Sequence, residues 1–516
     1  MGYFGLPSKA CSPCRGRRIK CDLSTPACSQ CVRSHRTCFG YRNPVDLLFH
    51  DQSEDVACKA QRPKRASQRR KAAESTIIVP KCSSPTLPSP VFFPISAETQ
   101  ASCFFFSNYP SKSSKTYKTM YEYIPALYCT ESSDSPLVCI VTALGLAGLS
   151  YHTDTSGLGT AATAWYDRAL RKTNYNLRHG ELAKLDRTLL VVLLLGLYET
   201  NTCRTPSYQS IESALTHVKG ATALLDLRGD KQLETDFGRA LFTQARTQII
   251  TGCYQTKTPV PDIVVRLSLS SRCHYDRIID PMGDIILSIS SFCNTKAEIP
   301  FHPPLYQSES VTRDTIARYA AITKSFEHWD QTLADGFLPT IVPVPNATPD
   351  VLSDHYHVYS DIWIAGFVNN YRANSILVHE ALVSQLCFLQ SHHAHDVNEI
   401  LELEDQIVRS RSIILSEIEA VCASVPGLLQ TKSAAAGVGL LWILYLSAQV
   451  APAIVPVPEK TRRWIIGRLE KIGAEMGVRQ ASTLAALLRE ELHIWSVLKV
   501  DQASIGWTEE SMVTCV

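Results

Sequence analysis

The pattern of hydrophobic and polar positions divides the chain into two unlike parts. From about Leu137 onward, apolar residues recur at steps of three and four, which is the spacing of an amphipathic helix. One such stripe runs from Ile211 to Leu224 and ends at Arg228 and Gly229, where glycine readily adopts the left-handed conformation that closes a helix. Alternation typical of strands is rare. This part is therefore predicted to be all-helical, with roughly a dozen or more packed helices.

Other segments of the same part support this prediction. Asp236 is placed to cap one helix, and an aromatic stripe at helical spacing begins at Trp363. The longest apolar run, Leu189 to Leu197, has about half the length that spans a bilayer, so we interpret it as a buried helix. The proline-rich stretch at 338–349 is predicted to be a loop.

The N-terminal part lacks this periodicity and has a different charge. The net charge of the chain is only +2, but residues 1–73 hold 15 Lys or Arg against 5 Asp or Glu. This gives the segment a balance of +10 and leaves about −8 for the rest, so only the N-terminal part suits a polyanion. The first residues lack the apolar stretch of a signal peptide, so we expect no export and reduced thiols.

Six of the 18 cysteines lie within residues 11–38 and repeat one spacing. Each half reads CxxC, then six residues, then a third cysteine. Two cysteines three apart at a helix start can hold one ion, and the third returns from beyond the helix. Two tetrahedral zinc ions need eight ligand positions, which six thiolates fill if two of them bridge both metals. The predicted ligands are Cys11, Cys14, Cys21, Cys28, Cys31 and Cys38, and the pseudo-symmetry assigns the bridges to Cys11 and Cys28.

Two other interpretations of the cysteines stay open at this point. A disulfide knot is typical of secreted mini-proteins. A zinc ribbon with a single ion would use the two CxxC pairs and leave Cys21 and Cys38 without a role.

The sequence CSPCRGRRIKC, the loop DLSTPA with Pro26, and CSQC together resemble the fungal Zn2Cys6 binuclear-cluster transcription factors. The resemblance implies two Zn²⁺ per chain and a short helix that reads a CGG-type triplet in the major groove of double-stranded DNA. Arg17 and Arg18 are predicted to meet a base edge, because a guanidinium matches guanine O6 and N7 with two hydrogen bonds. Phosphate contacts are predicted for Lys9, Lys20, Arg33 and Arg36, and Arg15 completes the basic run. The alternative is that these charges form only a solvated face.

These observations predict a small metal-stabilised Zn2Cys6 module, a disordered linker and a large all-α domain, over residues 1–45, 46–115 and 116–516. The linker carries a basic block and then a Pro- and Ser-rich stretch. We interpret the block as a nuclear localisation signal, with extra phosphate contacts or a solubilising tail as alternatives. Its residues are Arg62, Lys64, Arg65, Arg69, Arg70 and Lys71. No heptads follow the cluster, so no coiled coil is predicted there and dimerisation stays open.

The segments 217–253 and 361–382 also look like the helical regulatory region of many fungal zinc-cluster regulators. The chain has no GxSxG, phosphate-loop or dinucleotide motif, and no enzyme is predicted. The histidine-rich segment 391–396 is interpreted as a solvated loop, and His217 as a packed or capping histidine.

The predicted function is that of a nuclear, sequence-specific DNA-binding regulator of RNA polymerase II transcription. Its predicted partners are double-stranded DNA and the transcription machinery or co-regulators, with no membrane. A pathway-specific regulator of metabolic or biosynthetic genes is a finer form of this hypothesis. The alternative is a protein-interaction scaffold whose zinc module does not read DNA.

Overall fold

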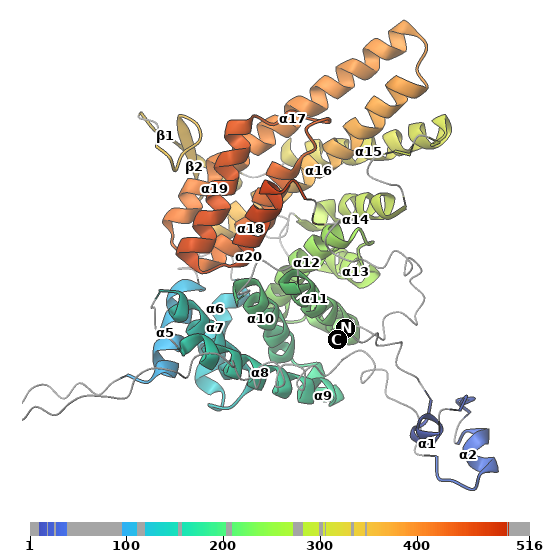
Figure 1. Ribbon diagram of the computed structural model, residues 1–516, viewed down its shortest axis with the longest axis vertical. Coiled ribbons are helices and arrows are strands. Elements are labelled where there is room, and N and C mark those ends of the chain that lie inside the picture. The colour runs from blue at the N-terminus through green and yellow to red at the C-terminus, as the bar shows by residue number, and fades with distance from the viewer. Residues whose placement is uncertain are drawn as a thin grey trace, which may run out of the picture.

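The computed structural model describes residues 10–17, 19–24, 27–38, 95–110, 119–152, 157–202, 209–271, 282–298, 303–304, 306–331, 335–345, 348–492 and 494 (Figure 1). The predicted nuclear localisation signal, Lys9 and Arg18 lie outside these residues. The described part comprises a small N-terminal head, residues 10–38, and a large body that begins at residue 95.

The head contains two short helices, α1 (Ser12–Gly16) and α2 (Ser29–Arg33). The α-helices of the body are α5 (Ala97–Asn108), α6 (Met120–Thr130), α7 (Pro136–His152), α8 (Leu158–Leu177), α9 (Gly180–Ala183), α10 (Asp186–Thr202), α11 (Gln209–Arg228), α12 (Asp236–Thr256), α13 (Asp262–Ser271), α14 (Met282–Glu298), α15 (Glu309–Gln331), α16 (Ile362–His392), α17 (Val397–Gln430), α18 (Ala434–Gln449), α19 (Glu459–Met476) and α20 (Gln480–Arg489). Two 3-10 helices, η1 (Gly229–Leu233) and η2 (Asp335–Phe337), and two strands, β1 (Thr340–Pro343) and β2 (His355–Val358), complete the described elements.

The prediction of a zinc module followed by a mainly helical region is confirmed. The stripe from Ile211 falls within α11, which ends at Arg228, and Gly229 follows with φ of +56°. The apolar run predicted as a buried helix lies in α10 and is buried throughout. Helix α12 begins at Asp236, but its cap is the preceding Thr235, whose hydroxyl accepts a hydrogen bond of 2.9 Å from the Gly238 N–H.

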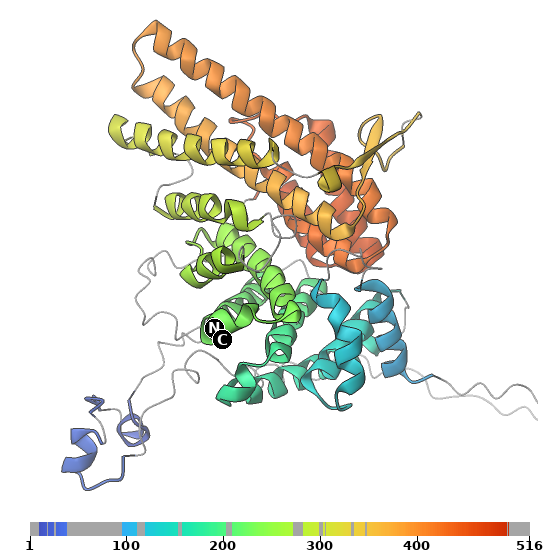
Figure 2. The same cartoon turned by 180° about the vertical axis from the view of Figure 1, so that it is seen from behind.

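The body has one continuous apolar core, although its helices form two groups. Helices α5 to α11 make up one group and α15 to α20 the other, while α12 to α14 lie between them (Figures 1 and 2). Buried apolar side chains nevertheless form a single cluster that extends from Ala101 to Ile494. The two longest helices, α16 and α17, pack along each other as an antiparallel pair (Figure 1).

The helical body begins earlier than the predicted boundary at residue 116. Helix α5 packs on α7 and buries Ala101 and Phe105. A Cβ atom at Gly145 of α7 would lie 2.0 Å from the Ala101 carbonyl oxygen, so only glycine permits this close approach. Because α5 has just two fully buried side chains, its sequence shows little periodicity, and it is difficult to recognise without its partner.

The stretch predicted as a loop near 338–349 contains a strand. β1 pairs antiparallel with β2, with Thr340 opposite Val358. Each strand has four residues, which is too short for a clear alternating pattern. A Cβ atom at Gly427 of α17 would lie 2.4 Å from the His357 carbonyl oxygen, so a bare backbone at Gly427 lets β2 rest against α17. The hairpin is therefore a product of tertiary packing.

Three arginines in the segment that looks like a regulatory region have structural partners. Arg228 pairs with Asp186 at the start of α10 and donates to the Lys184 carbonyl at 2.6 Å. Arg239 donates to the Leu233 carbonyl at 2.7 Å. Arg246 is buried, with its guanidinium 5.3 Å from the Phe242 ring centre. The contacts of Arg228 and Arg239 hold helix ends and loops of the body, and Arg246 packs within the core, so these residues are explained without a ligand.

Helix α17 is long and apolar enough by length and composition to cross a membrane. Half of its most apolar window is buried in the protein, as in a core helix, so this is weak evidence for a membrane span. It packs along α16 and α18.

Candidate metal centre and nucleic-acid interface

The two halves of the head repeat one local structure at an offset of 17 residues. Helix α1 follows Cys11, and α2 follows Cys28. The backbone N–H of Ile19 donates to the Cys14 carbonyl at 3.1 Å, and that of Arg36 donates to the Cys31 carbonyl at 3.0 Å. Both halves therefore turn back after the helix in the same way, which returns a third cysteine toward each CxxC pair.

The repeated structure gathers the six sulfur atoms into two groups of four. One group contains Cys11, Cys14, Cys21 and Cys28, and the other contains Cys11, Cys28, Cys31 and Cys38. Within each group all Sγ atoms lie within 4.8 Å of one another. The groups share Cys11 and Cys28, which are the two cysteines that the sequence assigns as bridges. None of the six forms a disulfide bond.

The spacing of the sulfurs suits zinc. Cys11 Sγ lies 3.6 Å from Cys28 Sγ and 3.6 Å from Cys31 Sγ. Four thiolates at Zn–S distances of about 2.3 Å form a tetrahedron with edges of about 3.8 Å. Both the donor type and the separations therefore fit two tetrahedral ions with two shared ligands. A single-zinc ribbon would use only the two CxxC pairs. Cys21 and Cys38 would then bind no metal, although the structure places each of them within a four-sulfur group.

Burial opposes the ionisation of several of these thiols. Burial raises the pKa of Cys14 well above its usual range and that of Cys31 to about 12. A backbone hydrogen bond from Cys11 lowers the pKa of Cys21. A divalent cation favours the thiolate, so metal binding, proton release and folding of the head are coupled.

A clip formed by Asp22 joins the two halves, and the sequence did not indicate it. The Asp22 carboxylate accepts hydrogen bonds from the Ser29 N–H at 3.1 Å, the Ser29 hydroxyl at 2.5 Å and the Ser24 hydroxyl at 2.9 Å. These bonds, that of the Ser29 hydroxyl foremost, lower the pKa of Asp22 to about 2. The first half thus caps the start of α2. An aspartate with serines two and seven positions later is common in sequences, so the sequence alone does not predict this contact.

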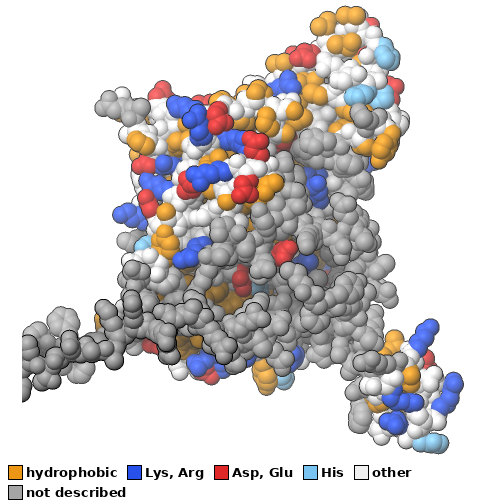
Figure 3. Space-filling model, in the orientation of Figure 1, with side chains coloured by type: hydrophobic (Ala, Val, Ile, Leu, Met, Phe, Trp, Pro, Cys, Tyr) orange, Lys and Arg blue, Asp and Glu red, His pale blue; other side chains and the backbone are white. Residues whose placement is uncertain are grey.

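The basic side chains of the head are exposed where the structure describes them. Lys20, Arg33 and Arg36 lie at the surface, and Figure 3 shows Lys and Arg side chains spread over the head. Arg17 is also exposed, but it donates a hydrogen bond of 3.1 Å to the Ser34 hydroxyl of the other half. The side chain of Arg15 lies outside the described residues. The head therefore combines a thiol-rich centre with a cationic surface, which defines a metal-stabilised module suited to a polyanion.

Comparison with known proteins agrees with this class. Residues 9–47 match the family described as the fungal Zn(2)-Cys(6) binuclear cluster domain, so the head belongs to this family. The domain binds two zinc ions and is the DNA-binding module of fungal transcription factors.

Two further comparisons concern curated proteins and solved structures. An uncharacterized protein of Emericella nidulans, AN5342, is 33% identical over 102 residues, which are 20% of this chain and 21% of that protein. The chain thus spans about a fifth of the length of the relative it matches. No solved structure matches the chain.

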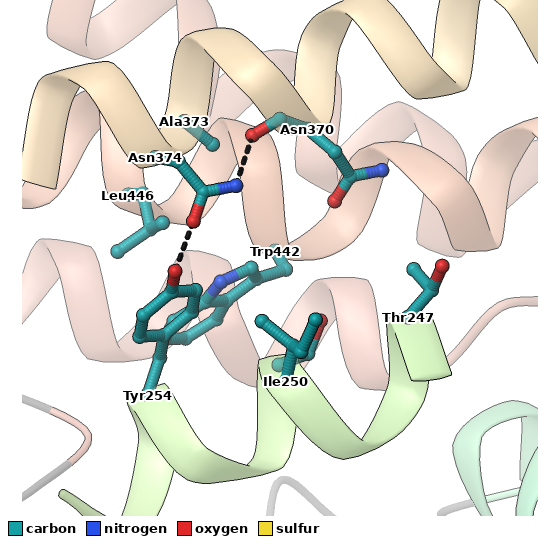
Figure 4. A pocket seen from close by; sticks show the side chains of 9 residues that line it. Thr247, Ile250, Tyr254, Asn370, Ala373, Asn374, Trp442 and Leu446 are labelled. Carbon is teal, nitrogen blue, oxygen red and sulfur yellow. Dashed lines mark hydrogen bonds between the residues drawn. The ribbon is translucent and has the colours of Figure 1, made fainter. Parts of the chain in front are cut away.

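The body contains a small cavity between α12, α16 and α18, lined by both apolar and polar side chains (Figure 4). Tyr254 donates a hydrogen bond to the Asn374 side chain, whose Nδ2 donates to the Asn370 carbonyl at 2.6 Å. The indole N–H of Trp442, which lines the same cavity, has no partner among the described residues. The cavity volume of about 10 Å³ admits roughly one water molecule. It does not accommodate a small-molecule ligand in this conformation.

The histidines considered in the sequence have ordinary packing contacts. His392 stacks on Phe388, and a ring nitrogen of His393 lies 3.2 Å from the Gln307 carbonyl oxygen. Among the described residues, the groups suited to a metal are both in the head. His217 packs in the body 3.2 Å from the Tyr166 hydroxyl, and burial lowers its pKa to about 4.

Proposed function

We propose that this protein is a nuclear regulator of RNA polymerase II transcription that reads CGG-type triplets through its zinc head. One observation carries the proposal: two four-thiol groups share two cysteines, and the chain between their members is densely basic. All six cysteines of the head act as zinc ligands in this proposal. A structural scaffold has no need of four cations between Cys14 and Cys21, whereas a module that docks on phosphates does.

The base-reading residue is assigned to Arg18, with Arg17 beside it. Arg17 donates a hydrogen bond to Ser34 in the free head. To contact a base directly, Arg17 must exchange this hydrogen bond for one to guanine. Lys9, Lys20, Arg33 and Arg36 supply the phosphate contacts, and Arg15 is a further DNA contact of the basic run. Such contacts set register and affinity, while the guanidinium fork on guanine supplies sequence discrimination.

The linker and the helical body are proposed to support this regulatory role. The basic residues at 62–71 direct import into the nucleus, and the helical body is a regulatory region that contacts co-regulators. A regulator of one metabolic or biosynthetic pathway, without enzyme activity of its own, is the finer form of the proposal.

Binding of zinc-loaded protein to labelled duplexes tests the proposal. Arg18→Ala is expected to weaken binding to a CGG duplex by about 1–3 kcal/mol and to relax the preference for guanine. Arg36→Ala is expected to weaken all duplexes alike and to lower the salt slope by about 1. The same losses on CGG and scrambled duplexes for both variants would mean that Arg18 contacts only phosphate. No preference of the unaltered protein for any duplex would favour the scaffold alternative.

A further inference from the structure

Helix α17 carries an apolar stripe that the body leaves uncovered. Its members are Val397, Leu401, Val408 and Leu415, with exposed fractions of 68%, 62%, 53% and 36%. The body-facing side of the same helix is a separate row, which includes the fully buried Ile407 and Ile414. Figure 3 shows apolar side chains along the arm that contains α17. These four residues, called here the α17 stripe, are therefore not part of the core of the body.

The spacing of the α17 stripe is that of helix pairing. Its members follow one another at steps of four, seven and seven residues, so they lie nearly above one another along the helix. At 1.5 Å per residue the stripe extends over about 27 Å. Single exposed apolar residues are ordinary on a protein surface, whereas a line of them marks an interaction site.

The position of one charged residue, Glu404, between the apolar residues favours pairing with a second copy of the chain in one orientation. Glu404 and Ser412, both exposed, separate the apolar positions. A parallel pair would place Glu404 against Glu404 of the second copy, which is repulsive. An antiparallel pair with its two-fold axis at Val408 places Leu401 opposite Leu415 and Glu404 opposite Ser412. This register removes the repulsion and makes the surface complementary to itself, as a two-fold dimer requires.

We propose that the α17 stripe is a homodimer interface in which two copies of α17 pair antiparallel about Val408. In this register Val397 meets Glu419, so the apolar contact is limited to the three central pairs. Such a small interface supports a dissociation constant in the micromolar range, of the order of 1–10 µM, and no obligate dimer. The interface does not depend on whether the head reads DNA.

Sedimentation of the zinc-loaded full chain tests the pairing. We expect a reversible monomer–dimer equilibrium between about 0.5 and 50 µM. Val408→Glu places two carboxylates at the axis and is expected to weaken dimerisation by about tenfold or more. Leu287→Glu is the matched control, because Leu287 of α14 is also exposed, at 55%, but lies on another helix. It should leave the equilibrium unchanged.

A second pair of variants tests the register and does not rely on an altered apolar residue. Ser412→Lys brings a cation opposite Glu404 in the antiparallel pair and is expected to strengthen it by about threefold, whereas Ser412→Glu should weaken it by a similar factor. Weakening by Ser412→Lys would overturn the antiparallel register. A chain that stays monomeric at about 50 µM, or a Val408→Glu variant that dimerises like the unaltered protein, would overturn the interface.

Discussion

Substitution of a shared cysteine should damage both zinc sites, while substitution of an unshared one should damage a single site. Cys28 belongs to both four-thiol groups, and Cys38 belongs to one. Cys28→Ser therefore leaves three thiols in each group. Cys38→Ser leaves one group intact and reduces only the other.

The size of the effect follows from the number of ligands. A structural zinc ion contributes an apparent binding free energy of about 10–16 kcal/mol, so each of four ligands accounts for about 2.5–4 kcal/mol. Loss of one ligand should thus weaken a site by about two to three powers of ten. We expect this weakening at both sites in Cys28→Ser. In Cys38→Ser we expect it at one site, with the other near its original affinity.

Competition with a coloured zinc chelator measures both affinities, and native mass spectrometry counts the ions that remain. Cys103→Ser is the control, since Cys103 is an exposed thiol of α5 in the body. Equal weakening of both sites in the two variants would refute the assignment of Cys28 as a shared ligand. One zinc ion per unaltered chain, undisturbed by Cys38→Ser, would establish the ribbon instead.

Three further predictions concern the head, the body and the linker. Asp22→Asn should accelerate zinc loss to a chelator more than Ser24→Ala does, because Asp22 holds α2 through Ser29; equal rates would contradict the clip. Burial lowers the pKa of His379 to about 4, so the folded body binds fewer protons than the unfolded chain below pH 6.5 and loses stability as the pH falls. The contribution of His379 to this loss should be about 2 kcal/mol at pH 5 in urea unfolding. His379→Leu should reduce it, and a change at exposed His395 should not. Residues 1–95, which end before α5, should sediment as a monomer and bind paired triplets at varied spacing equally well; a stable dimer would mean that the linker pairs.

The sequence alone determined the features that depend on local spacing. Ligands three positions apart and a third seven positions further are set by chain geometry around an ion, so the groups of sulfur atoms could be expected before any fold was known. Long helices such as α10 and α11 were predictable for a similar reason. Their apolar periodicity is strong enough to specify a helix whatever packs against it.

Tertiary structure decided the features that depend on a partner distant in sequence. Helix α5 packs closely on α7 because Gly145 has no side chain at the contact. The β1–β2 hairpin packs on α17 at Gly427 for the same reason. The Asp22 clip and the Arg17–Ser34 hydrogen bond likewise join residues whose relation appears only when the two halves fold together.

Helix α17 illustrates the limit of sequence periodicity. Its sequence contains two adjacent apolar rows with the same seven-residue repeat, one through Ile407 and Ile414 and one through Val408 and Leu415. The periodicity predicts that both rows lie on a helix, but it does not show which row faces the core. The body of the protein covers the first row and leaves the second in water. Which row is buried is fixed by the rotation of α17 about its axis, and that rotation is set by how its side chains pack against neighbouring helices.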